Sequence, residues 1–229
     1  MIETVRGDDV ADQFARLALE LHAAPGLEET VDAVTAFALH AVDCTSAAVE
    51  LTVLGGGVEV AAATSTMVEQ ILRFQIQTGD GPMLHAFSTA TTVNVPDPAT
   101  ETRWPLWCQF VRPLPVGSVL HVPLMGSGKP IGVLSLYRET VSPFSADDEA
   151  IAHILARHAT IAVGAVRHEL KLMQAVDARK VIGQAMGILM ERYDLTSDQA
   201  FAALRRASQD SNRKLQIVAQ EVIATRHAK

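Results

Sequence analysis

Hydrophobic positions near the start of the chain follow helical spacing and then change to the alternation that is typical of strands. The spacing predicts helices over Asp8–Ala23 and Leu27–Val42. β-type runs follow over 47–54 and 58–64, and the three glycines between them predict a hairpin turn. A third helix is expected over 67–77, and it ends at a stretch rich in glycine and proline.

The next part of the chain adds short elements joined by turns. A strand is predicted over 91–95, a short helix over 104–111, and two further strands over 119–125 and 131–137. Because most of these strands are joined by hairpins, the pattern predicts an α+β domain whose sheet is largely antiparallel.

One long helix is predicted from Ala146 to about Arg192, because this stretch contains no proline. Ser145 is its expected N-cap. A mostly apolar heptad register runs through Ile151, Leu155, His158, Ala162, Ala165, Glu169, Leu172 and Val176. This register predicts a parallel coiled-coil dimer, whereas the alternative is that the first half of the helix packs on its own sheet. Both interpretations are compatible with the sequence.

The tail of the chain contains two further helical stretches after the long helix. Thr196 and Gln199 have the spacing of a capping box, which predicts the start of one helix. Ser211–Asn212 is predicted to begin the last helix. Three helices of this length are expected to bury one small shared core.

Charge is distributed unevenly between the body and the tail. The chain has a formal net charge of −7, from 19 basic and 26 acidic residues. Residues 1–169 contain 9 Lys and Arg against 20 Asp and Glu, whereas residues 170–229 contain 10 against 6. An acidic body followed by a basic tail predicts two modules with different partners.

Composition limits the class of protein. Hydrophobic residues make up 48% of the chain and charged residues 20%, which is compatible with a packed core. The acidic N-terminal stretch lacks the features of a signal peptide, and no uncharged apolar run reaches roughly 18–20 residues. We therefore expect no membrane span and a cytoplasmic location.

Candidate chemistry is sparse. The sequence contains no motif typical of a catalytic or metal site, and His153 and His158 do not have the i, i+4 spacing of zinc ligands on a helix. Cys44 and Cys108 are interpreted as small buried residues rather than redox or cofactor-attachment sites. His85 is interpreted as a packing or surface residue, and so is His121. The sequence predicts that the protein is not an enzyme and holds no metal.

Three segments of the body resemble the GAF domain family: GDGPMLHAFSTATTVNVPD, SVLHVPLMGSGKPIGVLSLYRE and FSADDEAIAHILARHATIAV. The resemblance covers about Phe14 to Val166. It implies a sensor domain over residues 1–166, with a six-stranded antiparallel sheet and packed helices. GAF domains bind cyclic nucleotides, haem, bilins, other small molecules or no ligand, so the cofactor stays unassigned. If this GAF-like domain holds a small-molecule ligand, we expect the pocket near the Gly79–Leu84 loop and the strands around His121.

The basic tail resembles the ANTAR domain family over RKVIGQAMGILMERYDLTSDQAFAALRRASQDSNRKLQIVAQEVI. The resemblance implies a three-helix RNA-binding domain over residues 167–229. ANTAR domains act in transcription antitermination, and they bind paired stem-loops in nascent transcripts as dimers. Homodimerisation is therefore expected through the long helix.

Individual residues of the tail match the ANTAR pattern. The resemblance implies an RNA-facing surface made of Arg179, Ala185, Gly187, Arg205, Asn212, Arg213 and Lys214. It implies a core made of Ile182, Leu189, Leu204, Leu215 and Val218. Many members of the family have a lysine where this chain has Met186, which leaves the affinity and the RNA target open.

The two resemblances together imply a cytoplasmic, dimeric, signal-responsive regulator that acts on leader stem-loops by antitermination. One alternative is a small-molecule or redox sensor whose helical tail mediates protein–protein contact. Another alternative is a helical DNA-binding module, although the tail has no recognition-helix signature. The ligand, the regulated genes and the direction of the response are not specified by the sequence.

Overall fold

The computed structural model describes residues 12, 14–21, 23–53 and 55–225, and the chain divides into two compact units, Met1–Val166 and Arg167–Lys229. The first part of the predicted N-terminal helix, Asp8–Ala11, lies outside the described residues, and residues 14–21 are helical. Each unit contains a hydrophobic core of its own.

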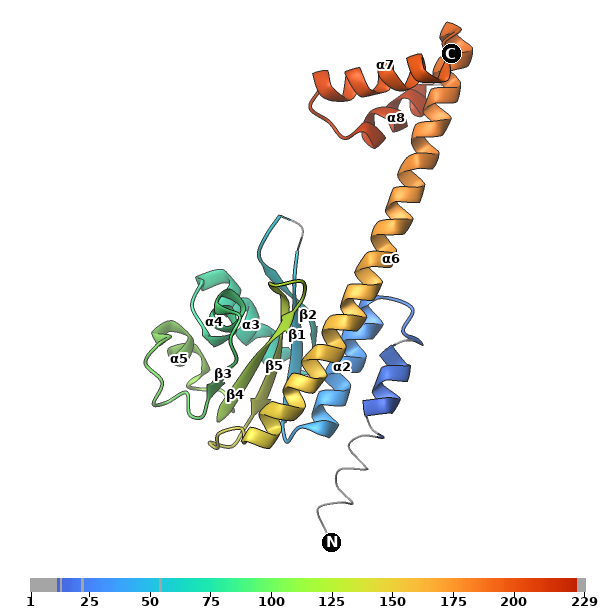
Figure 1. Cartoon of the computed structure of the whole chain (residues 1–229). Coiled ribbons are helices and arrows are strands. Elements are labelled where there is room, and N and C mark those ends of the chain that lie inside the picture. The colour runs from blue at the N-terminus through green and yellow to red at the C-terminus, as the bar shows by residue number, and fades with distance from the viewer. Residues whose placement is uncertain (1–11, 13, 22, 54, 226–229) are drawn as a thin grey trace. The chain divides into compact units, whose positions relative to one another are not determined.

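A five-stranded antiparallel sheet forms the centre of the first unit (Figure 1). Its strands are β1 (Ser46–Thr52), β2 (Val58–Ala63), β3 (Val93–Val95), β4 (Ser118–Met125) and β5 (Pro130–Arg138), in the order β2-β1-β5-β4-β3. The predicted α+β class is confirmed. Within the described residues the sheet has one strand fewer than the six that the GAF resemblance implied.

The two faces of the sheet carry separate apolar layers. Ala47, Val49 and Leu51 of β1 face a core shared with residues 14–21, α2 (Leu27–Ala41) and the first turns of α6 (Ala146–Tyr193). Ala48 faces the second core, which α3 (Thr66–Thr78), α4 (Pro82–Thr89) and α5 (Pro105–Val111) cover. The period of two residues in a strand therefore places helices on both faces, and the central strands are buried on both sides.

The sequence pattern predicts no helix at the position of α4, because the glycine- and proline-rich stretch at 78–82 is a turn signal. The helix begins with Pro82 at its first position, where the missing N–H group is tolerated. Gln75 of α3 caps it from a distance in sequence, since its buried Oε1 accepts a hydrogen bond of 2.9 Å from the backbone N–H of Met83. A Cβ at Gly81 would collide with the Gln75 side chain, which explains the glycine at this position.

Helix α6 starts as predicted, at a reciprocal cap. The backbone N–H of Asp148 donates to Ser145 Oγ at 3.1 Å, and the backbone N–H of Ser145 donates to Asp148 Oδ2 at 2.9 Å. The predicted heptad register is wrong over the first turns of the helix. Leu155 is fully buried in the core of the first unit, and Ile151 packs against the same core. These positions are used within the chain, as the alternative interpretation expected.

The second unit consists of the C-terminal part of α6, α7 (Ser197–Asp210) and α8 (Leu215–Ala224). The predicted capping box is confirmed: the backbone N–H of Thr196 donates to Gln199 Oε1 at 2.9 Å, and that of Gln199 donates to Thr196 Oγ1 at 3.3 Å. The core of the unit contains all five apolar residues that the ANTAR resemblance assigned to it, namely Ile182, Leu189, Leu204, Leu215 and Val218.

Candidate functional site

The basic residues of the second unit lie on its surface. The side chains or backbone of Arg179, Gly187, Arg205, Asn212, Arg213 and Lys214 are exposed. Within the described residues, Arg179, Arg205 and Lys214 form no ion pair. An unpaired, solvated cation meets a phosphate without first losing a partner, so these three are available to an anionic ligand.

The connection between α7 and α8 has a defined backbone conformation. Asn212 has a φ of +50°, in the left-handed region. The backbone N–H of Arg213 donates to the carbonyl of Ser208 at 3.1 Å, and that of Asn212 donates to the carbonyl of Gln209 at 3.2 Å. This pair of bonds is a Schellman motif, in which asparagine takes the position that is usually glycine. Asn212 therefore ends α7, and the prediction that it begins α8 is wrong.

Helix α8 begins at Leu215, with Lys214 as its N-cap residue and no side-chain cap. Ser208 Oγ donates a 2.5 Å hydrogen bond to the carbonyl of Arg213, which fixes the loop between the helices. The connection consequently presents Asn212, Arg213 and Lys214 as consecutive exposed side chains on an ordered backbone. This loop, residues 211–214, is called the α7–α8 loop below.

One member of the predicted surface is not on the surface. Ala185 is fully buried, in the core between α6, α7 and α8. Its spacing from Ile182 and Leu189 places all three on one face of α6, and this face packs against the other two helices. Met186 is half-buried and packs against the same core. Ala185 is therefore a packing residue in the folded unit, and we remove it from the candidate surface.

Gly187 lies beside a groove that was not expected from the sequence. Four residues of α6 and one of α8 line this space of about 590 Å³: Gln184, Gly187, Ile188, Glu191 and Ile223. A Cβ at Gly187 would meet nothing within 4 Å, so the glycine is not required by packing inside the chain. The groove lies on the surface of the second unit, apart from its apolar core.

The first unit contains a buried polar cluster under α3, α4 and α5. It consists of Glu50 on β1, His121 on β4, and Ser135 and Tyr137 on β5, all with 0–1% exposure. Ser135 Oγ donates to Glu50 Oε2 at 2.9 Å, and His121 Nδ1 lies 2.8 Å from Ser135 Oγ. The His121 ring meets the Tyr137 ring edge-on at 5.8 Å between centroids. We call these four residues the polar cluster.

Burial dominates the titration of the polar cluster. It raises the pKa of Glu50 to about 8 and lowers the pKa of His121 to about 3, because each charged form loses its hydration. Both groups are therefore largely uncharged near neutral pH. From the sequence, His121 is interpreted as a packing or surface residue and the strands around it are indicated for a ligand, but Glu50 is not identified, although a glutamate within an otherwise apolar strand is a readable signal.

The cysteines have the environment of structural residues. Burial raises the pKa of Cys44 to about 12 and also raises the pKa of Cys108. A thiol with a raised pKa forms little thiolate at neutral pH, so neither cysteine has the reactivity that a redox sensor needs.

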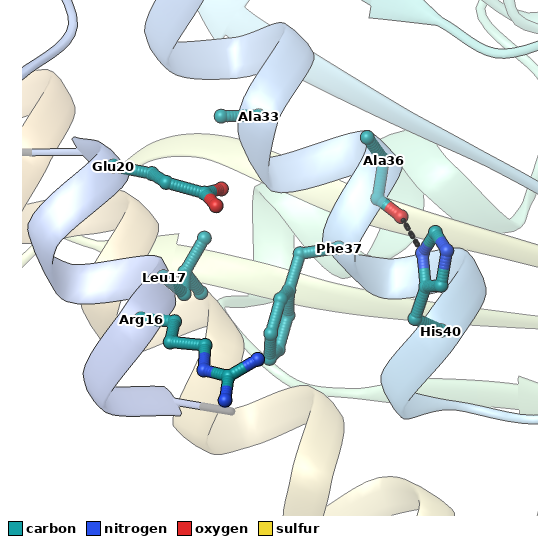
Figure 2. Close-up of a pocket in the computed structure, with 7 residues that line it drawn as sticks. All are labelled: Arg16, Leu17, Glu20, Ala33, Ala36, Phe37 and His40. Atoms are coloured by element: carbon teal, nitrogen blue, oxygen red, sulfur yellow. Dashed lines mark hydrogen bonds between the residues drawn. The ribbon is translucent and has the colours of Figure 1, made fainter. Parts of the chain in front are cut away.

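A further groove lies between the helical residues 14–21 and α2 (Figure 2). Its volume is about 460 Å³, and its lining residues are Arg16, Leu17, Glu20, Ala33, Ala36, Phe37 and His40. His40 Nδ1 is turned back to the carbonyl of Ala36 at 2.8 Å, as the dashed line in Figure 2 shows. Leu17 and Phe37 give the groove a mainly apolar floor, and the charged side chains of Arg16 and Glu20 belong to exposed residues around it.

Residues 12, 14–21, 23–53 and 55–225 contain no group of three His, Cys, Asp or Glu side chains that could hold a metal ion. In the same residues, no helix combines the length and the apolar character that crossing a membrane requires.

Comparison with protein families identifies both units. The GAF domain family matches residues 26–163, and the ANTAR domain family matches residues 170–223. A comparison with the curated proteins found no match.

Solved structures share the fold of the first unit. The GAF domain of a phosphoenolpyruvate-protein phosphotransferase from Coxiella burnetii is 16% identical, with a TM-score of 0.56, over 70% of this chain and 95% of that one. A GAF domain/HD domain protein from Geobacter sulfurreducens is 20% identical, with a TM-score of 0.53, over 64% and 97%. At these identities the likeness shows the fold alone.

Proposed function

We propose, from the premise that this chain belongs to the GAF domain family and carries an ANTAR domain behind its GAF domain, that it is a signal-responsive antitermination regulator. The ANTAR domain binds paired stem-loops in leader transcripts, and the GAF domain receives the signal. Both are regulatory domains, so the proposal assigns no catalytic step to the chain.

The observation that carries the proposal is the set of exposed cations in the second unit. Arg179, Arg205, Arg213 and Lys214 are exposed in a chain whose net charge is −7. A basic surface on an acidic protein is the electrostatic footprint of nucleic-acid binding, because phosphates attract it while the acidic unit repels them. We assign the RNA contacts to these four residues, with Gly187 and Asn212.

Roles within this surface follow from side-chain chemistry. The guanidinium groups of arginine pair with phosphates or stack on bases, and the ammonium group of Lys214 acts as a point charge on phosphate. The Asn212 side chain offers both donors and acceptors, which suits the edge of an unpaired loop base. Phosphate contacts set affinity, and the base contact sets discrimination.

The proposal includes a homodimer through α6, with a seam that differs from the predicted register. Ile161, Ala165, His168, Leu172 and Ala175 follow alternating spacings of four and three residues and are all exposed. Ile161 is 71% exposed and Leu172 is 55% exposed, which is unusual for large apolar side chains. Pairing two copies of α6 along these positions would bury them as knobs in a coiled coil.

A mobility-shift experiment with the full chain tests the RNA assignment. The probes are paired RNA hairpins with randomised loop bases, single hairpins from the same pool, and duplex DNA of equal length, at one salt concentration. The proposal predicts the tightest binding to paired hairpins. Equal binding to duplex DNA, or no binding to any of the probes, would contradict it.

A further inference from the structure

The stripe of α6 that carries the proposed dimer seam continues beyond its last apolar member. Leu172, Ala175 and Arg179 follow spacings of three and four residues, so Arg179 occupies the next position of the same stripe. Its side chain is exposed. Within the part of the chain that the structure describes, Arg179 forms no ion pair. The apolar seam therefore reaches an unpaired cation at Arg179.

The same stripe is covered inside the chain directly after Arg179. Ile182, Met186 and Leu189 continue the spacing of three and four residues, and all three pack against the core that α6 forms with α7 and α8. Because each copy uses this face for its own α7 and α8, the α6 helix of a second copy has no access to it from Ile182 onward. The seam must consequently end at Arg179.

Two copies of Arg179 meet at this end of the seam. In a parallel coiled coil, a residue of the seam lies opposite the same residue of the second helix, so the two guanidinium groups come together at the two-fold axis. The four residues on either side of Arg179 contain one carboxylate, that of Asp177. Residues two apart on a helix do not share a face, so Asp177 does not neutralise the pair, and Lys180 adds positive charge beside it.

A pair of like charges at one seam position favours dissociation of the dimer, and an anion between them reverses this effect. A guanidinium group binds phosphate oxygens through two parallel N–H donors, so two such groups can hold one phosphate from opposite sides. The RNA assigned to the second unit carries phosphates of this kind along its whole backbone.

We propose that the Arg179 side chains of two copies form one site at the dimer axis and bind a single phosphate of the RNA backbone there. Neither copy contains the site alone. The inference rests on the RNA-binding dimer proposed above and adds that RNA and the dimer stabilise each other. Because such coupling is reciprocal, RNA should tighten the dimer by the same factor by which dimerisation tightens RNA binding.

Arg179→Leu in the full chain distinguishes this site from an ordinary surface cation. Without RNA, the variant loses the repulsion and gains an apolar seam residue, so its dimer should be at least about tenfold tighter than that of the parent. With RNA, the variant lacks the phosphate site, so binding should be about tenfold weaker. Sedimentation equilibrium measures the dimer, and fluorescence anisotropy measures the binding of a paired hairpin from the randomised pool.

Two control variants carry the same kind of change at other exposed positions. Lys180→Leu removes a charge from the next residue of α6, which lies off the stripe, and should leave the dimer unchanged. Arg205→Leu on α7 should weaken RNA binding without tightening the dimer. Should Arg179→Leu aggregate through its new apolar side chain, Arg179→Gln removes the charge alone and should shift both affinities in the same directions.

The salt dependence of RNA binding counts the phosphates at the axis. It is measured at protein concentrations that keep the parent and the variant dimeric. If the two guanidinium groups share one phosphate, Arg179→Leu should lower the log–log salt slope per dimer by roughly 0.7 to 0.9, the value for one contact. Two separate phosphates would lower the slope by about twice as much.

The shared site is overturned if Arg179→Leu leaves the dimer affinity unchanged or lowers it, if the variant binds the hairpin as tightly as the parent, or if the slope falls by the value for two contacts. When the parent binds the hairpin, each of these results removes the shared site alone and leaves the RNA assignment standing. A parent chain that binds no hairpin contradicts the RNA assignment itself, and the shared site with it.

Discussion

Arg213 and Glu221 form a two-pronged ion pair between the α7–α8 loop and the second turn of α8. Nη1 of Arg213 lies 3.0 Å from Glu221 Oε2, and Nη2 lies 2.5 Å from Oε1. The Glu221 side chain thus partly neutralises one cation of the proposed RNA surface. Because both side chains are about half exposed, solvent screens the pair and its contribution to stability is small.

Substituting Glu221 and substituting Arg213 should change RNA affinity in opposite directions. Glu221→Gln releases Arg213 and removes a negative charge near the phosphates, so RNA affinity should rise roughly two- to fivefold. Arg213→Ala should lower it. Titration by fluorescence anisotropy with one selected hairpin measures both. If the two variants lower affinity equally, Arg213 acts only by holding the loop through Glu221.

Substitution at Asn212 should separate loop geometry from base recognition. Asn212→Ala keeps the Cβ in the left-handed region but removes the polar side chain that makes this conformation tolerable, so it should cost about 1 kcal/mol of stability. Asn212→Gly should be nearly neutral, because glycine has no Cβ. Thermal unfolding of the full chain measures this difference.

Asn212→Gly should also lose discrimination between the selected hairpin and one with altered loop bases, with little change in salt dependence. Unchanged discrimination in this folded variant would exclude Asn212 as a base-reading residue.

Introducing charge into the α6 seam should weaken the dimer without unfolding the first unit. Ile161→Lys and Leu172→Lys each place a charge where the coiled coil buries an apolar side chain, so together they should give a monomer at micromolar concentration. Sedimentation equilibrium measures the mass. Leu155→Lys is the contrasting variant, and it should unfold the first unit because Leu155 is a core residue. A seam double variant that remains dimeric contradicts the proposed register.

Stability should depend on pH through Glu50 and His121 in opposite senses. The raised pKa of Glu50, about 8 against an ordinary 4.5, stabilises the folded state fully below pH 4.5, and this contribution is lost as pH rises through 8. The lowered pKa of His121, about 3 against an ordinary 6.5, stabilises the folded state above pH 6.5, and this contribution is lost as pH falls through 3.

The two dependences cancel between pH 4.5 and 6.5, so Glu50 alone should give a fall in stability of up to about 1.4 kcal/mol per pH unit between pH 6.5 and 8. Thermal unfolding across this range measures the slope. Glu50→Gln should remove it, and Glu59→Gln should not. A slope that persists in Glu50→Gln would assign the titration to another group.

The sequence predicted every strand of the sheet because hydrophobic alternation and glycine turns are local signals. Helix α4 was missed for the opposite reason, since its cap comes from Gln75, eight residues before Met83. The heptad register was wrong over the first turns of α6 because it also depends on contacts that lie far apart in the sequence. Periodicity shows that Leu155 is on an apolar face of α6, but whether that face meets a second copy or its own sheet depends on tertiary packing.

Within the candidate surface, Asn212 shows the same limit of local sequence patterns. Asparagine is favoured both at helix N-caps and at left-handed C-terminal positions, so sequence alone could not assign Asn212 to the end of α7. Ala185 could have been recognised as a core residue, because it lies three residues after Ile182 and four before Leu189. The ion pair between Arg213 and Glu221 depends on how the loop returns onto α8, which no local pattern encodes.

The salt dependence of RNA binding by the Arg213→Ala/Lys214→Ala variant tests the central claim most directly. Its matched control is Arg112→Ala/Lys129→Ala, which removes the same charges from exposed positions of the first unit. Circular dichroism must first show that both variants are folded. The log–log salt slope of the control should equal that of the parent. For the Arg213/Lys214 variant, affinity should fall and the slope should decrease by roughly 0.7 for each lost phosphate contact on single-stranded segments. An unchanged affinity and slope in the folded Arg213/Lys214 variant would contradict the account.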